Sequence, residues 1–129
     1  MLKATLYNDN MNITYSFEKR PTADEIIELY DNTGLPRPTY DKERIQKMFD
    51  NSNLIVTAWD EDLLVGVSRS ITDWVWACYL SDLAVRHDYK NEGIGQTTYK
   101  PDKGKSWRPI NGFTFISSNS HGILSKSWI

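Results

Sequence analysis

The sequence predicts a single α/β domain, and three observations lead to that prediction. The chain has 129 residues, which is the size of one domain. Hydrophobic residues make up 40% of it and charged residues 25%, as in globular rather than disordered or fibrous proteins. Up to Gly95, the two-residue period of strands and the 3.6-residue period of helices follow one another in a clear order: strand, helix, helix, strand, strand, strand and glycine loop.

The first predicted element is a strand near the N-terminus. Ile13, Tyr15 and Phe17 alternate with polar residues, which is typical of a half-buried strand. Met11 opens this segment, and it is therefore a candidate for the natural start of the protein. The alternative interpretation is a frayed terminus that precedes the strand.

Two amphipathic helices are predicted next. Thr22 lies three residues before Glu25, an arrangement typical of a capping box. Gly34 and the prolines just beyond it are expected to end this first helix. Asp41 can cap the second helix, which should end at the Asn-Ser-Asn of residues 51–53.

Three further strands are predicted before the glycine loop. Residues 54–59 and 63–69 are short β-rich runs joined by a polar turn at residues 60–62, so they predict a hairpin. Alternating residues at 74–78 and the run 79–85 predict a central strand. The polar loop that follows leads directly into Gly-Ile-Gly.

The composition excludes several functional classes. Fifteen Lys and Arg against 17 Asp and Glu give a net charge of -2 without a clustered basic excess, so no nucleic-acid partner is expected. One cysteine (Cys78, expected in the core) and two histidines (His87 and His121) argue against a disulfide framework and against a metal site. No apolar run approaches the ~20 residues that span a bilayer, and the N-terminus lacks a signal peptide's apolar core. We therefore expect a cytoplasmic protein without a membrane partner.

The stretch from Leu83 to Gln96 carries the most chemical information. Here a strand leads into a loop whose glycines, Gly93 and Gly95, would let backbone N–H groups converge on an anion. The N-terminus of a following helix would add its positive dipole end, and such a loop suits a pyrophosphate. The alternative is a plain strand-to-loop turn whose glycines serve conformation only.

Val85 followed by residues 90–95, Lys-Asn-Glu-Gly-Ile-Gly, resembles motif A of the GNAT superfamily of N-acetyltransferases. The glycine spacing is that of the motif, whereas Lys90 stands where Gln or Arg is usual, His87 where Pro is common, and Asn91 where Gly is common. The preceding elements are also similar to the N-terminal half of that superfamily. The resemblance implies an acyl-CoA N-acyltransferase-like α/β (α+β) fold: a mixed, largely antiparallel sheet with flanking helices, incomplete in its C-terminal part.

The resemblance implies acetyl-CoA as co-substrate and acetyl transfer to a primary amine of a small molecule or a peptide. Backbone amides of the loop would hold the pyrophosphate, and main-chain groups of the preceding strand would pair with the pantetheine arm. The implied cofactor-binding residues are Leu83, Val85, Lys90, Asn91, Glu92, Gly93, Ile94, Gly95 and Gln96. A non-catalytic CoA-binding or partner-binding domain derived from an acetyltransferase stays open as the alternative, and so does a homodimer.

Asp82 is the carboxylate best placed to accept the proton of the attacking amine. Strand alternation, however, puts Asp82 on the face opposite to Leu83 and Val85, so a structural role for this acid has equal standing. Three aromatic residues are expected to wall an acceptor pocket, or alternatively to pack the sheet: Trp74, Trp76 and Tyr79.

The pattern changes within the predicted single domain of residues 1–129: residues 11–96 are well patterned, whereas 97–129 form an atypical tail with poor helix propensity. Read one nucleotide later with synonymous codons, the last nine residues can encode Met-Glu-Tyr-Tyr-Pro-Lys-Val-Gly-Phe, which resembles an otherwise missing segment of the superfamily. We infer a reading frame shifted near Gln96. The competing interpretation is a genuine tail, with a hairpin turn at residues 110–113 and an edge strand containing Phe113, Phe115 and Ile116.

The tail predicts a weakened site. Pro101 and Gly104 should limit any helix that begins at Ile94 to about two turns, since an interior proline costs roughly 3 kcal/mol. The resemblance implies a tyrosine that protonates the leaving thiolate, yet Tyr99, the only tyrosine after the glycine loop, lies too near that loop. We therefore expect weak CoA binding and poor catalysis from this chain.

Overall fold

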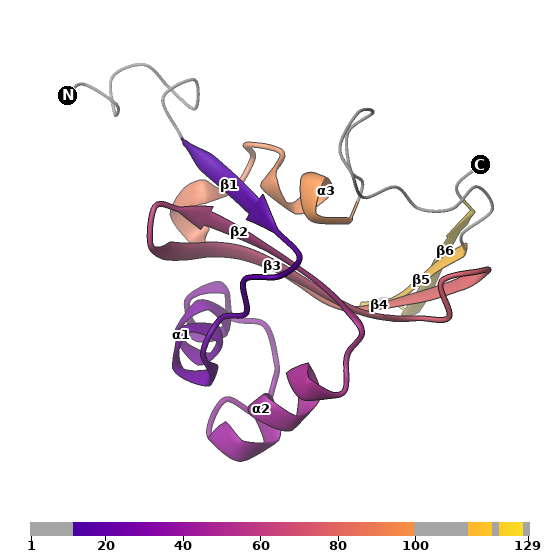
Figure 1. Ribbon diagram of the computed structural model, residues 1–129, viewed down its shortest axis with the longest axis horizontal. Coiled ribbons are helices and arrows are strands. Elements are labelled where there is room, and N and C mark those ends of the chain that lie inside the picture. The colour runs from indigo at the N-terminus through magenta and orange to yellow at the C-terminus, as the bar shows by residue number, and fades with distance from the viewer. Residues whose placement is uncertain (1–11, 100–113, 120–121, 128–129) are drawn as a thin grey trace.

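A computed structural model describes residues 12–99, 114–119 and 122–127 of the chain (Figure 1). The elements are β1 (Ile13–Ser16), α1 (Ala23–Thr33), α2 (Lys42–Asp50), β2 (Leu54–Asp60), β3 (Leu63–Thr72), β4 (Ala77–Val85), a 3-10 turn (His87–Tyr89), α3 (Ile94–Tyr99), β5 (Thr114–Asn119) and β6 (Gly122–Ser127). The predicted order of strand, helix, helix, three strands and glycine loop is confirmed. No helix in this described part has the length and apolar character needed to cross a bilayer.

The strands form one sheet in the order β1-β2-β3-β4-β5-β6. Neighbouring strands from β1 to β4 are antiparallel, β5 runs parallel to β4, and β6 is antiparallel to β5. The sheet is therefore mixed and largely antiparallel, as predicted. Its helices lie on two faces: α1 and α2 cover one, and α3 covers the other (Figure 1).

The main core lies between the sheet and the pair α1 and α2. Each nonpolar side chain buried there contributes roughly 1.5–3 kcal/mol relative to an exposed one. The buried helix residues are Ile26, Leu29, Tyr30, Ile45 and Phe49, and the strand residues are Ile55, Trp59, Leu64, Val67 and Ala84. This packing fixes α1 and α2 against β2, β3 and β4, and leaves the opposite face of the sheet for α3.

The helix ends follow the capping chemistry that the sequence predicts. The Thr22 hydroxyl accepts a bond from the Glu25 N–H (3.1 Å), and the Glu25 carboxylate accepts one from the Thr22 N–H (2.9 Å). Gly34 ends α1 at a φ of 71°, in the left-handed region that favours glycine. Asp41 caps α2 through the Arg44 N–H at 3.1 Å.

The structure corrects the start of the central strand. Trp74 and Trp76, predicted to alternate along it, lie in the turn before β4, and Trp74 has a φ of 65°. One oxygen of Asp73 accepts bonds from the N–H groups of three successive residues, 75 to 77, at 2.8–2.9 Å. This local capture of backbone donors ends the extended conformation that the alternation favours.

The C-terminal strands correct the edge strand of the competing interpretation of the tail. β5 contains Phe115 and Ile116 and forms a strand as expected, but it lies between β4 and β6 and so not at the edge of the sheet. Phe113 and the hairpin turn predicted at 110–113 lie outside the described residues. The shifted reading frame stays a prediction.

Candidate cofactor-binding site

A β-bulge interrupts β4 in the middle. Leu80 pairs with Ser70 and Asp82 pairs with Arg69, so two consecutive residues of β3 lie opposite three residues of β4. Ser81 is the extra residue. A bulge of this kind breaks the ladder and bends the strand that carries it, so β4 changes direction at Ser81.

The pairing between β4 and β5 ends at the same place. It joins Ala77–Leu80 to 114–117, although β4 continues to Val85 and β5 to Asn119. The two parallel strands therefore separate after Leu80. From Ser81 onward, the edge of β4 that faces away from β3 has no strand beside it in the described part of the chain; we call residues 81–85 the open edge.

Main-chain groups of Leu83 and Val85 face this open edge. The Arg86 N–H donates to the carbonyl of Val65 on β3 at 2.7 Å, so the backbone of Arg86 points toward β3. Successive residues of a strand point their N–H and C=O groups in opposite directions. The N–H and C=O groups of Leu83 and Val85 therefore point to the open edge. An extended ligand lying along that edge could form hydrogen bonds with them.

The glycine loop lies next to the open edge and leads into α3. Asn91 and Gly93 have φ angles of 67° and 76°, a left-handed conformation that glycine adopts freely and that asparagine tolerates better than most residues. The Gly93 carbonyl accepts the first bond of the helix, from the Thr97 N–H at 3.0 Å. The N–H groups in the first turn of a helix have no acceptor within it, so this loop can present donors to an anion.

Gly95 brings the backbone of α3 close to the open edge. A Cβ at this position would lie 3.4 Å from Cγ2 of Val85 and 3.9 Å from the Leu83 side chain. The side chains of Leu83 and Val85 thus lie on the α3 face. A larger residue at position 95 would fill the space beside them, and the residues present therefore fit a ligand that lies along β4 and ends at the loop.

Contacts with β3 fix the position of α3. Ile94 is 2% exposed and packs with Val65, and a Cβ on Gly66 would lie only 3.0 Å from Cγ2 of Ile94. The Ser68 hydroxyl donates to the carbonyl of the buried Thr98 at 3.0 Å. α3 can approach the sheet this closely because residue 66 has no side chain. The described part of α3 runs from Ile94 to Tyr99, and Pro101, which is predicted to limit the helix, lies outside the described residues.

Arg86, which the sequence did not single out, anchors the start of the loop. Its guanidinium donates to both carboxylate oxygens of Glu28 on α1, at 2.7 and 2.5 Å, and to the Leu64 carbonyl at 2.9 Å. The His87 N–H donates to the side-chain oxygen of Asn32 at 2.8 Å. The loop is thereby attached to α1, on the far side of the sheet from α3.

Tyr89 anchors the middle of the loop to the end of β2. Its hydroxyl donates to Asp60 at 2.6 Å. This hydrogen bond, together with partial burial and the charge of Asp60, raises the pKa of Tyr89 to about 12. Its contact with Asp60 therefore gives Tyr89 a structural role in holding the loop to β2, and the hydroxyl stays protonated at neutral pH.

Asp82 lies on the helix-facing side of β4, opposite to the side chains of Leu83 and Val85, as strand alternation predicts. Its carboxylate is 0% exposed and accepts bonds from the Tyr30 hydroxyl (2.8 Å) and from Arg37 and Arg69 (2.7 Å each). Burial alone would raise the pKa of Asp82, but the bonds and charges of these partners hold it below its ordinary value. This geometry supports the structural alternative for Asp82; its role as proton acceptor stays a prediction.

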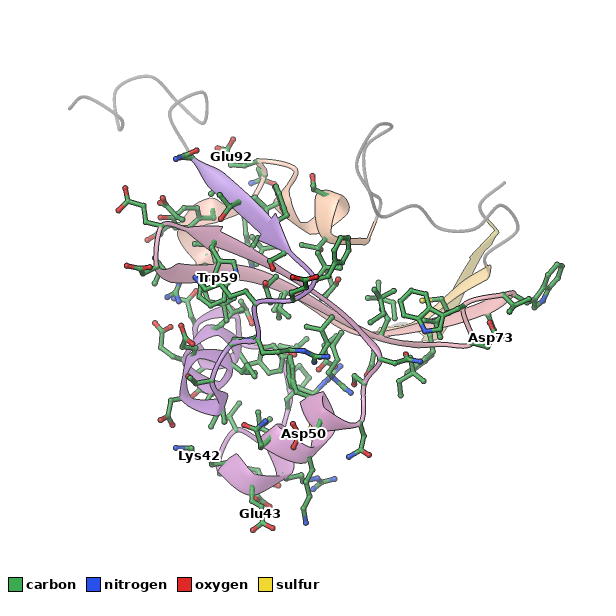
Figure 2. The ribbon with its side chains drawn as sticks, viewed as in Figure 1. Lys42, Glu43, Asp50, Trp59, Asp73 and Glu92 are labelled. Carbon is green, nitrogen blue, oxygen red and sulfur yellow. The ribbon has the colours of Figure 1, made fainter. Side chains whose placement is uncertain are left out.

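The three aromatic residues predicted to wall an acceptor pocket come before the bulge at Ser81, at the other end of β4 from the glycine loop, and that pocket stays a prediction. Trp74 and Trp76 are 43% and 66% exposed in the turn at Asp73, which lies far from Glu92 of the loop (Figure 2). Along β4 the two ends are roughly 26 Å apart, at about 3.3 Å per residue. Tyr79 is the nearest of the three, one residue before the strands separate.

Comparison with known proteins agrees with this geometry. Residues 20–100 match the family model of the acetyltransferase (GNAT) family. No curated protein sequence matches the chain.

Several solved structures are similar. A protein of unknown function from methicillin-resistant Staphylococcus aureus, described as a probable acetyltransferase, is 25% identical over 67% of this chain and 63% of its own, with a TM-score of 0.60. A GNAT family acetyltransferase from Streptococcus pneumoniae is 26% identical over 68% of this chain and 63% of its own, with a TM-score of 0.57. The chain thus spans less than two thirds of the length of both.

A third structure, the PaiA N-acetyltransferase of Thermoplasma acidophilum in complex with coenzyme A, shares the fold. It is 19% identical over 69% of this chain and 68% of its own, with a TM-score of 0.52. The family uses acetyl-CoA. Since the family model covers well over half of the sequence, including α1, α2, α3 and the glycine loop, the chain belongs to the acetyltransferase (GNAT) family.

Proposed function

We propose that the chain binds acetyl-CoA along the open edge of β4 and transfers the acetyl group to a primary amine of a small molecule or a peptide. The observation that carries this proposal is the separation of β4 from β5 beside a glycine loop. Main-chain groups of Leu83 and Val85 would pair with the pantetheine arm. Amides of residues 90–96 would hold the pyrophosphate, and the acetyl group would then lie near Leu80, where the strands part.

The reaction needs little chemistry from side chains. A neutral amine attacks the thioester carbonyl, a C–N bond forms, and the C–S bond breaks with its electron pair on sulfur. The amine loses a proton to a base, and the thiolate gains one. We favour an ordered water as the base over Asp82, because the Asp82 carboxylate is buried on the other face and accepts hydrogen bonds from four side chains.

The proposed activity is low. Pro101 and Gly104 are expected to keep α3 short, so the donors of its first turn would have little helix dipole behind them. Tyr99, the last described residue of α3, is the only tyrosine in residues 97–129. This second observation favours a non-catalytic CoA-binding domain as the other candidate function. Either function would operate in the cytoplasm, where the single, buried Cys78 stays reduced.

Titration calorimetry with acetyl-CoA, together with an acetylation assay over a panel of amines, separates these functions. Binding with turnover supports the transferase, binding without turnover supports the CoA-binding domain, and absence of binding contradicts both.

A matched pair of variants locates the binding site. Gly93 and Gly34 have φ angles of 76° and 71°, and neither has an atom within 4 Å of an added Cβ. Gly93→Asp and Gly34→Asp therefore introduce similar backbone strain and the same charge. We expect Gly93→Asp to weaken acetyl-CoA binding at least tenfold, because the new carboxylate faces the pyrophosphate. Gly34→Asp, at the end of α1, should leave the affinity within twofold of the wild-type value.

A further inference from the structure

The bulge residue Ser81 has unusual partners for its polar groups. A residue inserted into a β-ladder has no regular backbone partner across the sheet. The Ser81 carbonyl instead accepts a bond from Nη2 of Arg37 at 2.9 Å, and the Ser81 hydroxyl accepts one from Nη2 of Arg69 at 2.8 Å. Two arginines from distant parts of the chain therefore hold the one residue that gives β4 its bend.

Asp82 joins the same two arginines. Nε of Arg37 donates to one carboxylate oxygen and Nε of Arg69 to the other, both at 2.7 Å. Each guanidinium thus spans two consecutive residues of β4, with Nε on Asp82 and Nη2 on Ser81. The fixed fork of arginine suits this arrangement, because its donors lie in one plane at set angles.

Both arginines are themselves held in place. Arg37 lies in the α1–α2 connection between two prolines, which restrict its backbone, and it donates to the Pro36 carbonyl at 2.7 Å. Arg69 on β3 donates to the Ser52 hydroxyl at 3.0 Å, just beyond α2. The Arg69 side chain is 9% exposed and its guanidinium lies 5.8 Å from the ring of Phe49.

We propose that Arg37 and Arg69, joined through Asp82, clamp the bulge at Ser81 and so fix the register of the open edge. The alternative register is a regular ladder without the bulge. A shift of one residue would turn every side chain of residues 82–85 to the other face and would turn the main-chain groups of Leu83 and Val85 away from the open edge. The functional role of this clamp rests on the proposed function, since the open edge is where the pantetheine arm would bind. The two arginines and Asp82 are positioning residues.

The lysine variants Arg69→Lys and Arg37→Lys test the clamp. Lysine keeps the positive charge beside Asp82, but its single ammonium cannot bond Asp82 and Ser81 with the geometry of a guanidinium. We expect each variant to bind acetyl-CoA at least tenfold more weakly than the wild-type chain in titration calorimetry. Lys42→Gln is the control: it removes an exposed ion pair with Asp24 on the helices, and it should leave the affinity unchanged.

A measurement without ligand separates the clamp from general stability. Amide hydrogen exchange followed by NMR should show alternation along the open edge of the wild-type chain. The amides of Asp82 and Ala84 face β3 and are protected, whereas those of Leu83 and Val85 exchange quickly. In the lysine variants we expect this alternation to be lost or inverted, while the protection of α1 is kept; a general loss of stability would instead lower protection throughout.

The outcomes are distinct. An unchanged alternation in both lysine variants overturns the clamp, whatever their affinity for acetyl-CoA. If the wild-type chain does not bind acetyl-CoA, the proposed function fails, but the exchange pattern still decides whether the arginines set the register.

Discussion

Replacing Gly66 with alanine should disturb α3 and, through it, the glycine loop. The new Cβ would lie 3.0 Å from Cγ2 of Ile94 and 3.4 Å from Cβ of Ala58. Both distances are shorter than ordinary contacts of a Cβ, so Ile94 would have to retreat by a few tenths of an ångström. Ile94 is 2% exposed and begins α3, so the helix and the loop before it would have to move as well.

The expected cost follows from two opposing effects. Overpacking a core site costs about 1–3 kcal/mol. Replacement of glycine by alanine within a strand returns about 0.5–1 kcal/mol, because the unfolded chain loses freedom. The net effect therefore lies between no change and a loss of about 2.5 kcal/mol, which lowers the melting temperature of a domain of this size by up to about 10 °C.

A second substitution tests the cause. Leucine has no methyl group at the Cγ2 position, so Ile94→Leu should relieve the contact and restore part of the stability lost in Gly66→Ala. Thermal unfolding of the two single variants and the double variant gives the coupling between the sites. A Gly66→Ala variant more stable than the wild-type chain, or purely additive effects in the double variant, would refute the close approach of α3 to β3.

Three further changes test the anchors of the site. Glu28→Gln should weaken acetyl-CoA binding several-fold in calorimetry, because Arg86 loses the charged partner that attaches the loop to α1. Tyr89→Phe should abolish a loss of stability at high pH: the raised pKa, about 12, means that the contribution of this hydroxyl is present below pH ~10 and is lost as the pH rises through 12. Asp82→Asn should reduce the dependence of the free energy of unfolding on pH in acid, as measured by urea unfolding. Since the pKa of Asp82 is lowered, its contribution is present above pH ~4 and is lost as the pH falls below that value.

The parts of the fold that the sequence predicts correctly depend on local chemistry. Thr22 and Glu25 lie three residues apart, and Gly34 acts through its own backbone, so the bounds of α1 can be derived from one short segment. The same holds for the glycine loop. Strand alternation alone also predicts that Asp82 lies on the face opposite to Leu83 and Val85. This prediction holds because the bulge at Ser81 comes before these three residues and does not interrupt them.

The parts that it misses depend on contacts between distant residues. The bulge at Ser81 is held by Arg37 and Arg69, which are 44 and 12 residues away, and no local pattern marks it. The anchoring of Arg86 by Glu28 spans 58 residues. The turn at Asp73 is local, but the alternation of the tryptophans after it favours a strand and hides the capture of backbone donors. The acceptor pocket that those tryptophans are expected to wall stays a prediction.

The most direct test of the central claim is an NMR titration of the chain with acetyl-CoA, in which backbone amide shifts are followed residue by residue. Binding along the open edge predicts the largest shifts at Leu83, Val85 and residues 93–95. The amides of α2, on the other face of the sheet, should stay unchanged. Shifts centred on α2, or no shifts at saturating acetyl-CoA, would contradict the proposed binding site.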